Sequence, residues 1–229
     1  MRAIILAAGE ASRWGNYLGV PKHLVPVGGE PVLHRTVRLL REARPGLDIV
    51  IVARPEDLDR YLVPGAVTVE ADLDPARFDA DKFLSSRRYW NWQGETVLLY
   101  GDAFYTRDAI ATILSTTPDD GFLLFARFGP SAITGAKWAE PFAFRLRGEV
   151  HRRFEGAGDE LIRQYRTRKL HRIGGWEFYA SLTGADLSMP GEFAGHGVWI
   201  DDWTEDFDYP QDFDEWARRM VMGGQFHVL

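Results

Sequence analysis

The sequence predicts an α/β fold built on a mostly parallel central sheet. Three observations support this prediction: apolar runs of strand length recur through the first half, helix-like stretches separate most of them, and the first run is apolar on successive residues. A run that is apolar on successive residues is typical of a strand buried on both faces, and such strands occur mainly in parallel sheets. Strands that alternate with helices form such sheets because each helix returns the chain to the starting edge.

The elements of the first half follow in order from these runs. Strands are predicted at residues 2–7, 48–53, 67–70, 96–100 and 122–126. Helix starts are indicated by a proline that suits the first turn or by a polar capping residue, and these stand at Pro31, Pro55, Asp79 or Asp81, and Thr106. The helix that begins at Asp79 or Asp81 is predicted to extend to Trp90.

The alternation loosens after about residue 130. The predicted elements there are a strand at 141–146, helices at 159–172 and 176–182, a short strand at 198–200 and a helix at 210–220. No internal repeat or low-complexity linker interrupts the chain. We therefore expect one domain, residues 1–229, with a soft boundary between a first half, 1–128, and a second half, 129–229.

The composition excludes several classes of protein. The 229 residues contain no cysteine, and the six histidines lack paired zinc-ligand spacing, so neither a disulfide framework nor a thiolate metal site is expected. The net charge of −6 argues against a general nucleic-acid binder, and the basic run at 163–172 is better explained as the solvated face of a helix. No stretch reaches the ~18 apolar residues of a membrane span. We expect a cytoplasmic protein with neither nucleic-acid nor membrane partners, and the sequence leaves a homodimer open.

Small residues and two cations follow the first predicted strand. This strand ends at Ala7, Ala8 and Gly9, where no side chain is larger than a methyl group, so a ligand can approach the backbone. Arg13 and Lys22 place permanent positive charges beyond the carboxyl end of the strand, where open α/β sheets bind ligands. A polyphosphate is the natural partner. Because the Walker and GxGxxG motifs are absent, side-chain cations and turn amides would hold its phosphates.

These residues belong to a longer ordered set, which comprises Leu6-Ala7-Ala8-Gly9, Ser12-Arg13, Pro21-Lys22, residues 24–29 and Pro31-Val32-Leu33. The set resembles the signature of the nucleotidyltransferase family, which includes sugar-phosphate, phosphocholine and molybdenum-cofactor nucleotidyltransferases. The resemblance implies a Rossmann-like three-layer sandwich of the nucleotide-diphospho-sugar transferase type. Its first half would bind an NTP and Mg²⁺, and its second half a phosphorylated acceptor. The chain departs from the signature at Glu10-Ala11 and at residues 16–20.

The resemblance also implies roles for single residues. The residues implied in NTP binding are Leu6, Ala7, Ala8, Gly9, Arg13, Lys22, Ser85 and Asp102. Lys22 and Arg13 would be catalytic: Lys22 would neutralise charge on the α-phosphate, and Arg13 would hold the triphosphate and the departing pyrophosphate. Asp102 and Asp208 would bind Mg²⁺, with Asp206 as the alternative second ligand.

Asp102 also stands out without the resemblance. An apolar strand that ends in Gly-Asp delivers a carboxylate to the carboxyl edge of the sheet, and we expect Gly101 to leave room for a ligand. Hard oxygen ligands of this kind suit Mg²⁺, which takes only one or two protein carboxylates. The other interpretation of Asp102 is a turn residue at the strand end or the cap of the next helix.

The sequence contains no motif that identifies the acceptor site, only candidate residues. Residues that could line it are Trp138, Glu140, Phe142, Trp176, Trp199 and Trp203. An aromatic wall beside an acid would suit a quaternary ammonium or a sugar ring, although core packing is the commoner role of such residues. Arg127 and Lys137 are candidate cations for an acceptor phosphate.

We therefore expect an Mg²⁺-dependent nucleotidyltransferase that joins an NTP to a phosphorylated small molecule, either a sugar phosphate or a choline-phosphate-like acceptor, and releases pyrophosphate. The alternatives are a molybdenum-cofactor guanylyl- or cytidylyltransferase, a nucleotide-sugar-dependent glycosyltransferase and a non-catalytic nucleotide-binding protein. A glycosyltransferase would release no pyrophosphate. A nucleotide sensor would not need Lys22, Asp102 and Asp208 together.

Overall fold

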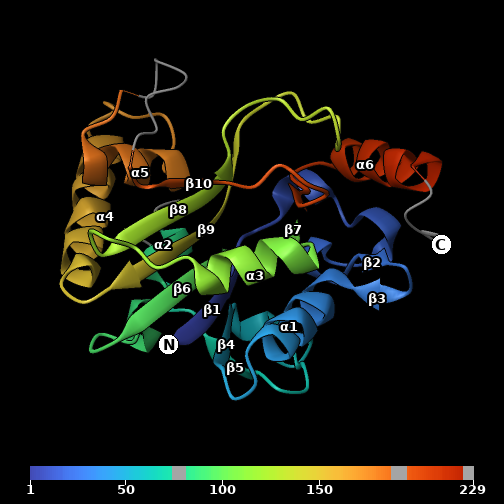
Figure 1. Ribbon diagram of the computed structural model, residues 1–229, viewed down its shortest axis with the longest axis horizontal. Helices are drawn as coiled ribbons and strands as arrows, with labels where there is room; N and C mark the ends of the chain where they lie inside the picture. The colour runs from blue at the N-terminus through green and yellow to red at the C-terminus, as the bar shows by residue number, and fades with distance from the viewer. Residues whose placement is uncertain (74–80, 187–194, 224–229) are drawn as a thin grey trace.

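A seven-stranded sheet forms the centre of the computed structural model, which describes residues 1–73, 81–186 and 195–223 (Figure 1). Its strands are β1 (Arg2–Ala7), β4 (Asp48–Ala53), β5 (Val67–Glu70), β6 (Glu95–Tyr100), β8 (Phe122–Arg127), β9 (Glu140–Arg147) and β10 (Gly197–Trp199). They lie in the order β10-β8-β9-β6-β1-β4-β5. β9 is antiparallel to both neighbours, and the other pairs are parallel. The predicted α/β fold with a mostly parallel sheet is confirmed.

The central strands end at a common edge. Ile4 and Ile5 of β1 are fully buried, as expected for a strand covered on both faces. Leu6 of β1 stands opposite Val52 of β4 and Tyr100 of β6, so the three strands finish at the same level. The segments that follow them therefore meet at the carboxyl edge of the sheet.

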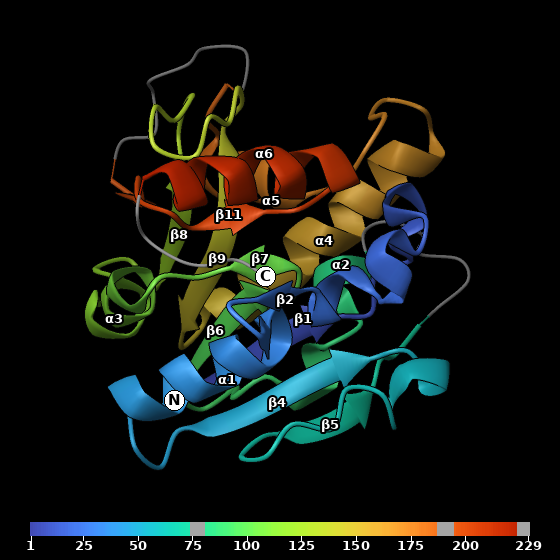
Figure 2. The ribbon, with the colours of Figure 1, turned by 90° about the vertical axis from the view of Figure 1, so that its right-hand side faces the viewer.

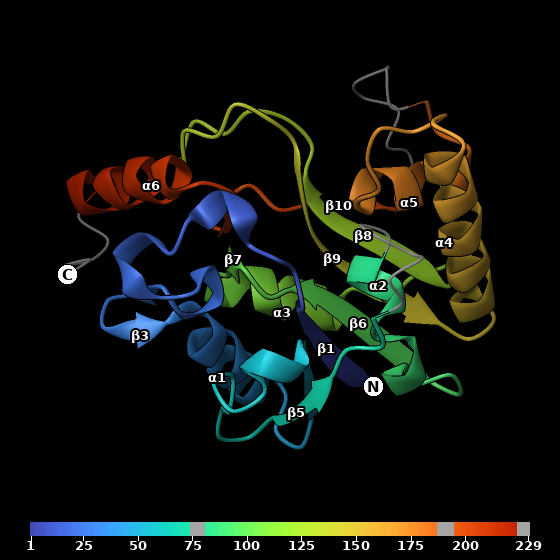
Figure 3. The same cartoon turned by 180° about the vertical axis from the view of Figure 1, so that it is seen from behind.

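Helices cover both faces of the sheet, which makes three layers (Figures 1 and 3). The helices α1 (Val32–Ala43) and α3 (Arg107–Ser115) lie on one face, and α2 (Asp81–Leu84), α4 (Val150–Arg166) and α5 (Gly175–Thr183) lie on the other. Thr106 caps α3 as predicted, since its Oγ1 accepts a 3.0 Å hydrogen bond from the Ala109 amide. Within the described ranges, no helix is long and apolar enough to cross a membrane.

A second hydrophobic cluster fixes the last helix, α6 (Pro210–Met222), beside the carboxyl edge. In Figure 2, α6 lies above the two-residue strands β7 (Ala103–Phe104) and β11 (Glu205–Asp206), which pair antiparallel. The buried members of this cluster are Trp14, Val25, Val27, Val32, Phe104, Phe207, Phe213, Trp216 and Met220. They come from the segment between β1 and the start of α1, from β7, and from α6 and the residues before it, so packing brings the two ends of the chain together.

The long loop after β1 is held by this cluster. It contains three short 3-10 turns, Ser12–Trp14, Tyr17–Gly19 and Lys22–Leu24, and is followed by a small hairpin of β2 (Pro26–Val27) and β3 (Glu30–Pro31). The Trp14 indole packs 6.3 Å from the Phe213 ring and donates a 3.0 Å hydrogen bond to the Val20 carbonyl. The Tyr17 hydroxyl donates to Asp214 of α6 at 2.6 Å. The departure at residues 16–20 thus has a structural role, because Tyr17 ties the loop to α6.

Two predicted helices have different bounds in the structure. The helix predicted at 159–172 begins at Val150, because Val150 and Phe154 extend its buried face, and Gly158 allows close contact with Leu84. It ends at Arg166, since Arg168 adopts a left-handed φ of 58°. The helix predicted to reach Trp90 ends at Leu84 and is followed by a separate 3-10 turn, Arg87–Tyr89. The possible start at Asp79 lies outside the described residues.

The two prolines act near helix starts in different ways. Pro31 stands directly before α1, which begins at Val32. Pro55 begins a 3-10 turn, Pro55–Asp57, so the helical start indicated there is a short 3-10 turn and no α-helix.

Candidate active site

A buried ion pair joins the ends of two segments at the carboxyl edge of the sheet. Lys22 is the first residue of a 3-10 turn, and Asp102 stands between β6 and β7. The Lys22 ammonium contacts the Asp102 carboxylate, and the two residues are only 7% and 4% exposed. The expectation that these residues share a site is consistent with this contact.

The segment before α6 adds a second carboxylate and reaches the other predicted cation. The Asp208 Oδ1 atom lies 3.8 Å from Lys22 Nζ, and its Oδ2 atom accepts a 2.5 Å hydrogen bond from Arg13. The Arg13 guanidinium also lies 5.4 Å from the centre of the Tyr209 ring. The fold thus brings together two predicted cations and two predicted metal ligands that come from opposite ends of the chain.

Asp206, the alternative second ligand, lies close to the same ammonium. β11 pairs with β7 so that Asp206 stands opposite Ala103, next to Asp102 in sequence. Asp206 is 8% exposed, whereas the side chain of Asp208 is 45% exposed. The carboxylate buried deeper is therefore Asp206, and the one open to a ligand is Asp208.

The carboxylates control the charge of Lys22. Burial by itself would lower the pKa of the Lys22 ammonium, but the negative charges of Asp102, Asp206 and Asp208 outweigh burial and raise that pKa above its ordinary value. Asp208 likewise raises the pKa of Arg13. Both side chains are therefore cations at neutral pH, as phosphate contacts require.

The turn after β1 opens to solvent as it leaves the sheet. Leu6 and Ala7 are buried in β1, Ala8 is half-buried and Gly9 is exposed. A Cβ atom built on Gly9 would meet nothing within 4 Å. Of the four turn residues predicted to bind NTP, Ala8 and Gly9 are thus the two whose backbone a ligand can reach.

Arg54 is a third cation at this edge that the sequence analysis missed. It follows β4 and donates a 3.0 Å hydrogen bond to the Ala8 carbonyl and a 3.1 Å hydrogen bond to Glu10. It therefore braces the turn at the place where Glu10 departs from the family signature. Its position directly after a predicted strand is the signal that could have found it.

The expected role of Gly101 is wrong. A Cβ atom on Gly101 would lie 2.6 Å from the Leu6 carbonyl oxygen and 3.2 Å from the His23 ring. The Gly101 amide donates to that same carbonyl at 3.0 Å. The missing side chain thus allows β1 and the end of β6 to approach each other and does not make room for a ligand.

Ser85 lies apart from these contacts among the described residues. It is 1% exposed, and its carbonyl accepts a 2.8 Å hydrogen bond from the Asp72 amide, after β5. Its proposed contact with a nucleotide stays a prediction.

The candidate acceptor residues separate into groups. Arg127 is buried and pairs with Glu205 through contacts of 3.0 and 2.9 Å, so it is not free for an acceptor phosphate. Lys137 is exposed. Phe142 belongs to the core and Trp203 packs beside α6. Phe128 lies 5.8 Å from Trp176 and 6.0 Å from Trp199, between ring centres, whereas Trp138 is 79% exposed.

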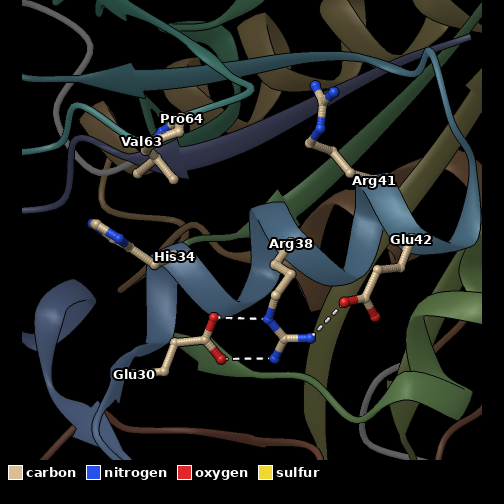
Figure 4. Close-up of a pocket in the computed structure, with 7 residues that line it drawn as sticks. All are labelled: Glu30, His34, Arg38, Arg41, Glu42, Val63 and Pro64. Carbon is tan, nitrogen blue, oxygen red and sulfur yellow. Dashed lines mark hydrogen bonds and ion pairs between the residues drawn. The ribbon is translucent and has the colours of Figure 1, made fainter.

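A hollow of about 380 Å³ on the exposed side of α1 is a different feature (Figure 4). It is lined by Glu30, His34, Arg38, Arg41, Glu42, Val63 and Pro64. Arg38 donates to Glu30 at 2.8 and 2.7 Å and to Glu42 at 2.9 Å, so both carboxylates in the hollow already have an arginine partner. No lining residue belongs to the cluster around Lys22, and we place the candidate site at the carboxyl edge.

Comparisons with known proteins identify the family. Residues 3–166 match the model of a family described as "MobA-like NTP transferase domain". The curated bifunctional protein GlmU of Chromobacterium violaceum is 31% identical over 104 residues, which are 45% of this chain and 22% of GlmU. The chain thus matches about a fifth of that relative's length.

Solved structures share the fold over nearly the whole chain. A CTP:phosphocholine cytidylyltransferase from Streptococcus pneumoniae is 16% identical, with a TM-score of 0.55, and the match covers 95% of this chain and 97% of that one. A putative glucose-1-phosphate thymidylyltransferase from Bacillus anthracis is 15% identical, with a TM-score of 0.58 and coverage of 100% and 96%. An inositol-1-phosphate CTP transferase from T. maritima is 14% identical, with a TM-score of 0.58 and coverage of 96% of both chains.

Proposed function

The chain belongs to the MobA-like NTP transferase family and is a nucleotidyltransferase, and on that premise we propose that it joins an NTP to a phosphorylated small molecule and releases pyrophosphate. One observation carries the proposal. The Lys22 ammonium contacts the Asp102 carboxylate and lies 3.8 Å from Asp208, at the carboxyl edge of the sheet. A non-catalytic nucleotide binder has no need of a buried cation placed among acids at a ligand-binding edge.

The two cations would serve different parts of the triphosphate. An oxygen of the acceptor phosphate attacks the α-phosphorus, and the bond from that phosphorus to the bridging oxygen of the β-phosphate breaks. The acceptor needs little help from a base, because a phosphate monoester has a second pKa of about 6 and is largely dianionic at neutral pH. Buried Lys22 would stabilise the charge that develops on the α-phosphoryl oxygens, and the more exposed Arg13 would hold the leaving pyrophosphate.

The chemistry of the site fits Mg²⁺. Asp102 and Asp208 supply hard oxygen donors and already face one shared cation, the Lys22 ammonium. Within the described part of the chain, no group of three or more His, Cys, Asp or Glu side chains is arranged around a metal position. A magnesium ion on these two carboxylates, with Asp206 as the alternative to Asp208, would neutralise negative charge on the phosphates.

The acceptor we propose is a sugar phosphate or a choline-phosphate-like molecule. Phe128, Trp176 and Trp199 form a partly exposed aromatic cluster where β8 and β10 end, and aromatic faces bind both sugar rings and ammonium groups. A molybdenum-cofactor acceptor is the second candidate, because the matching family is described as MobA-like. The cytoplasmic location and the homodimer stay predictions from the sequence.

A pyrophosphate-release panel tests the proposal. Each of the common NTPs is combined with choline phosphate, aminoethyl phosphonate, hexose 1-phosphates and a molybdopterin acceptor, with and without Mg²⁺. We expect one NTP and acceptor pair to release pyrophosphate in a metal-dependent manner, and Lys22→Met to remove this signal. Consumption of a nucleotide sugar without pyrophosphate release would instead favour a glycosyltransferase.

A further inference from the structure

A buried ion pair connects strand β8 to the acidic segment before α6. Arg127, the last residue of β8, donates from both terminal nitrogens to the two oxygens of Glu205, at 3.0 and 2.9 Å. The side chains of Arg127 and Glu205 are only 2% and 8% exposed. Arg127 also reaches the carbonyls of Thr204, at 3.5 Å, and Trp138, at 3.4 Å. Arg127 is therefore a buried anchor for two backbone segments of the second half, one at Trp138 and one at Thr204.

Glu205 directly precedes a residue of the Lys22 cluster. It forms β11 with Asp206, and the Asp206 amide donates to Glu205 Oε1 at 3.3 Å. Successive side chains of a strand point to opposite sides, so the Glu205 side chain can face Arg127 while Asp206 faces Lys22. The ladder between β11 and β7 has only two residue pairs. Thr204 Oγ1 also accepts a 3.2 Å hydrogen bond from the Thr106 amide, and Phe207 packs in the second hydrophobic cluster. Arg127 adds a buried ionic anchor that ties this segment to β8.

We propose that Arg127 is a positioning residue of the enzyme: through Glu205 it holds the segment that presents Asp206 and Asp208 to the metal and to Lys22. The part of this inference that concerns the metal rests on the proposed function. The part that concerns the segment rests only on the contacts of Arg127. Arginine is required because its planar fork binds both carboxylate oxygens at once, whereas a lysine binds as a point charge.

The chain offers a matched control. Arg145 of β9 is also buried and donates to Glu95 at 2.9 Å. It also donates to the Leu114 and Thr116 carbonyls, at the end of α3. Glu95 begins β6, so this pair stands at the opposite edge of the sheet from Lys22. Arg127→Lys and Arg145→Lys therefore make the same chemical change at two places, only one of which touches the acidic segment.

The first measurement follows amide hydrogen exchange in a peptide that covers residues 203–209. We expect Arg127→Lys to speed exchange there by roughly tenfold, and Arg145→Lys to leave it unchanged within about twofold. This readout requires neither metal nor substrate. It therefore decides whether Arg127 positions the segment even if the proposed reaction is wrong. Equal exchange in the two variants would overturn the proposal.

The second measurement is the Mg²⁺ concentration that gives half-maximal pyrophosphate release. We expect Arg127→Lys to raise it by about tenfold and Arg145→Lys to change it less than about twofold, with unfolding midpoints recorded for both. If Arg127→Lys does not fold, the neutral pair Arg127→Met with Glu205→Leu replaces it, because apolar replacement of a buried ion pair often preserves stability. A restored fold with a weakened Mg²⁺ response supports positioning. Recovery of the wild-type Mg²⁺ response in the double variant would reject it.

Discussion

The ammonium of Lys22 and the carboxylate of Asp102 form an ion pair at the carboxyl edge of the sheet, where the two residues are 7% and 4% exposed. Two further acids, Asp206 and Asp208, keep this ammonium charged. The pair therefore has two functions in this fold. It joins the loop after β1 to the end of β6, and in the proposed reaction it would supply the cation on the α-phosphate and a metal-binding carboxylate.

Replacement of Asp102 by asparagine should impair stability and turnover together. Removing one partner of a buried ion pair typically costs about 3–5 kcal/mol, and we expect the lower end because Asp206 and Asp208 still compensate Lys22. Urea unfolding and pyrophosphate release measure the two effects. The exposed Asp119 provides the control, and Asp119→Asn should change neither. Metal-dependent turnover that persists in Asp102→Asn would contradict its assignment as a ligand.

Substitutions of Lys22 and Arg13 should impair different steps, the chemical step and NTP binding respectively. Lys22→Ala is expected to lower kcat by about 10²- to 10³-fold with a smaller change in NTP affinity, because its charge acts most strongly in the transition state. Arg13→Ala should mainly weaken NTP binding, since its side chain is 56% exposed and reaches the outer carboxylate, Asp208. Single-turnover rates and NTP dissociation constants separate the two outcomes. An unchanged chemical rate in Lys22→Ala would reject the proposed mechanism.

The identity of the second metal ligand can be decided by three asparagine variants. Asp208→Asn should raise the Mg²⁺ requirement about tenfold or more and loosen Arg13, because Asp208 contacts both Arg13 and Lys22. Asp214→Asn removes a nearby acid that bonds only Tyr17 in the described contacts, and its Mg²⁺ requirement should match the wild type. If Asp206→Asn shows the larger Mg²⁺ effect, the ligand is Asp206.

Two glycine substitutions distinguish a ligand-facing position from a packing position. Gly9→Ala should fold normally, because its Cβ meets nothing within 4 Å, but it should weaken NTP binding by filling space beside the turn. Gly101→Ala places a Cβ 2.6 Å from the Leu6 carbonyl oxygen, so β1 and the β6 end must separate, at a cost of about 1–3 kcal/mol. Thermal unfolding and NTP titration of both variants check this contrast. Unchanged NTP binding by Gly9→Ala would mean that the ligand does not approach there.

His151 should make stability depend on pH. Burial lowers its pKa from 6.5, and the neutral ring bonds the Gly148 carbonyl at 2.8 Å and Thr96 Oγ1 at 2.9 Å. The folded protein binds a proton at His151 less readily than the unfolded chain does. The contribution of His151 to the free energy of unfolding is therefore fully present above pH 6.5 and is lost as the pH falls below it. Urea unfolding between pH 7.5 and 5 should show this slope in the wild type and a weaker one in His151→Gln. Equal slopes would show that another group titrates.

Local patterns were sufficient for the strands and for part of the site. The runs at 2–7, 48–53 and 67–70 are strands with the predicted bounds. The first two are central strands that need apolar side chains at successive positions, whereas 67–70 is a partly exposed edge strand in which apolar and polar residues alternate. Arg13 and Lys22 were found because they belong to the ordered set that resembles the family signature, and Asp102 was found because it closely follows a strand end. These features depend on neighbours in the sequence.

Long-range packing decided the features that sequence patterns did not reveal. Arg127 and Glu205 are 78 residues apart, and nothing near either one indicates that each neutralises the other. Gly101 was expected to leave room for a ligand because its true neighbour, the Leu6 carbonyl, is far away in the sequence. The two come together only when β1 and β6 pair in the sheet. The basic run after residue 166 was expected to continue a helix that the fold ends earlier.

Sequence therefore established the class of fold and most strand ends and singled out the charged residues of the candidate site, because these follow from the apolar and polar pattern of each segment. Tertiary structure decided which charges meet. Only the assembled sheet and the docking of α6 place Asp208 within 3.8 Å of Lys22 and bury Arg127 against Glu205. The physical reason is that an ion pair depends on distance and burial, and both arise only when distant segments pack together.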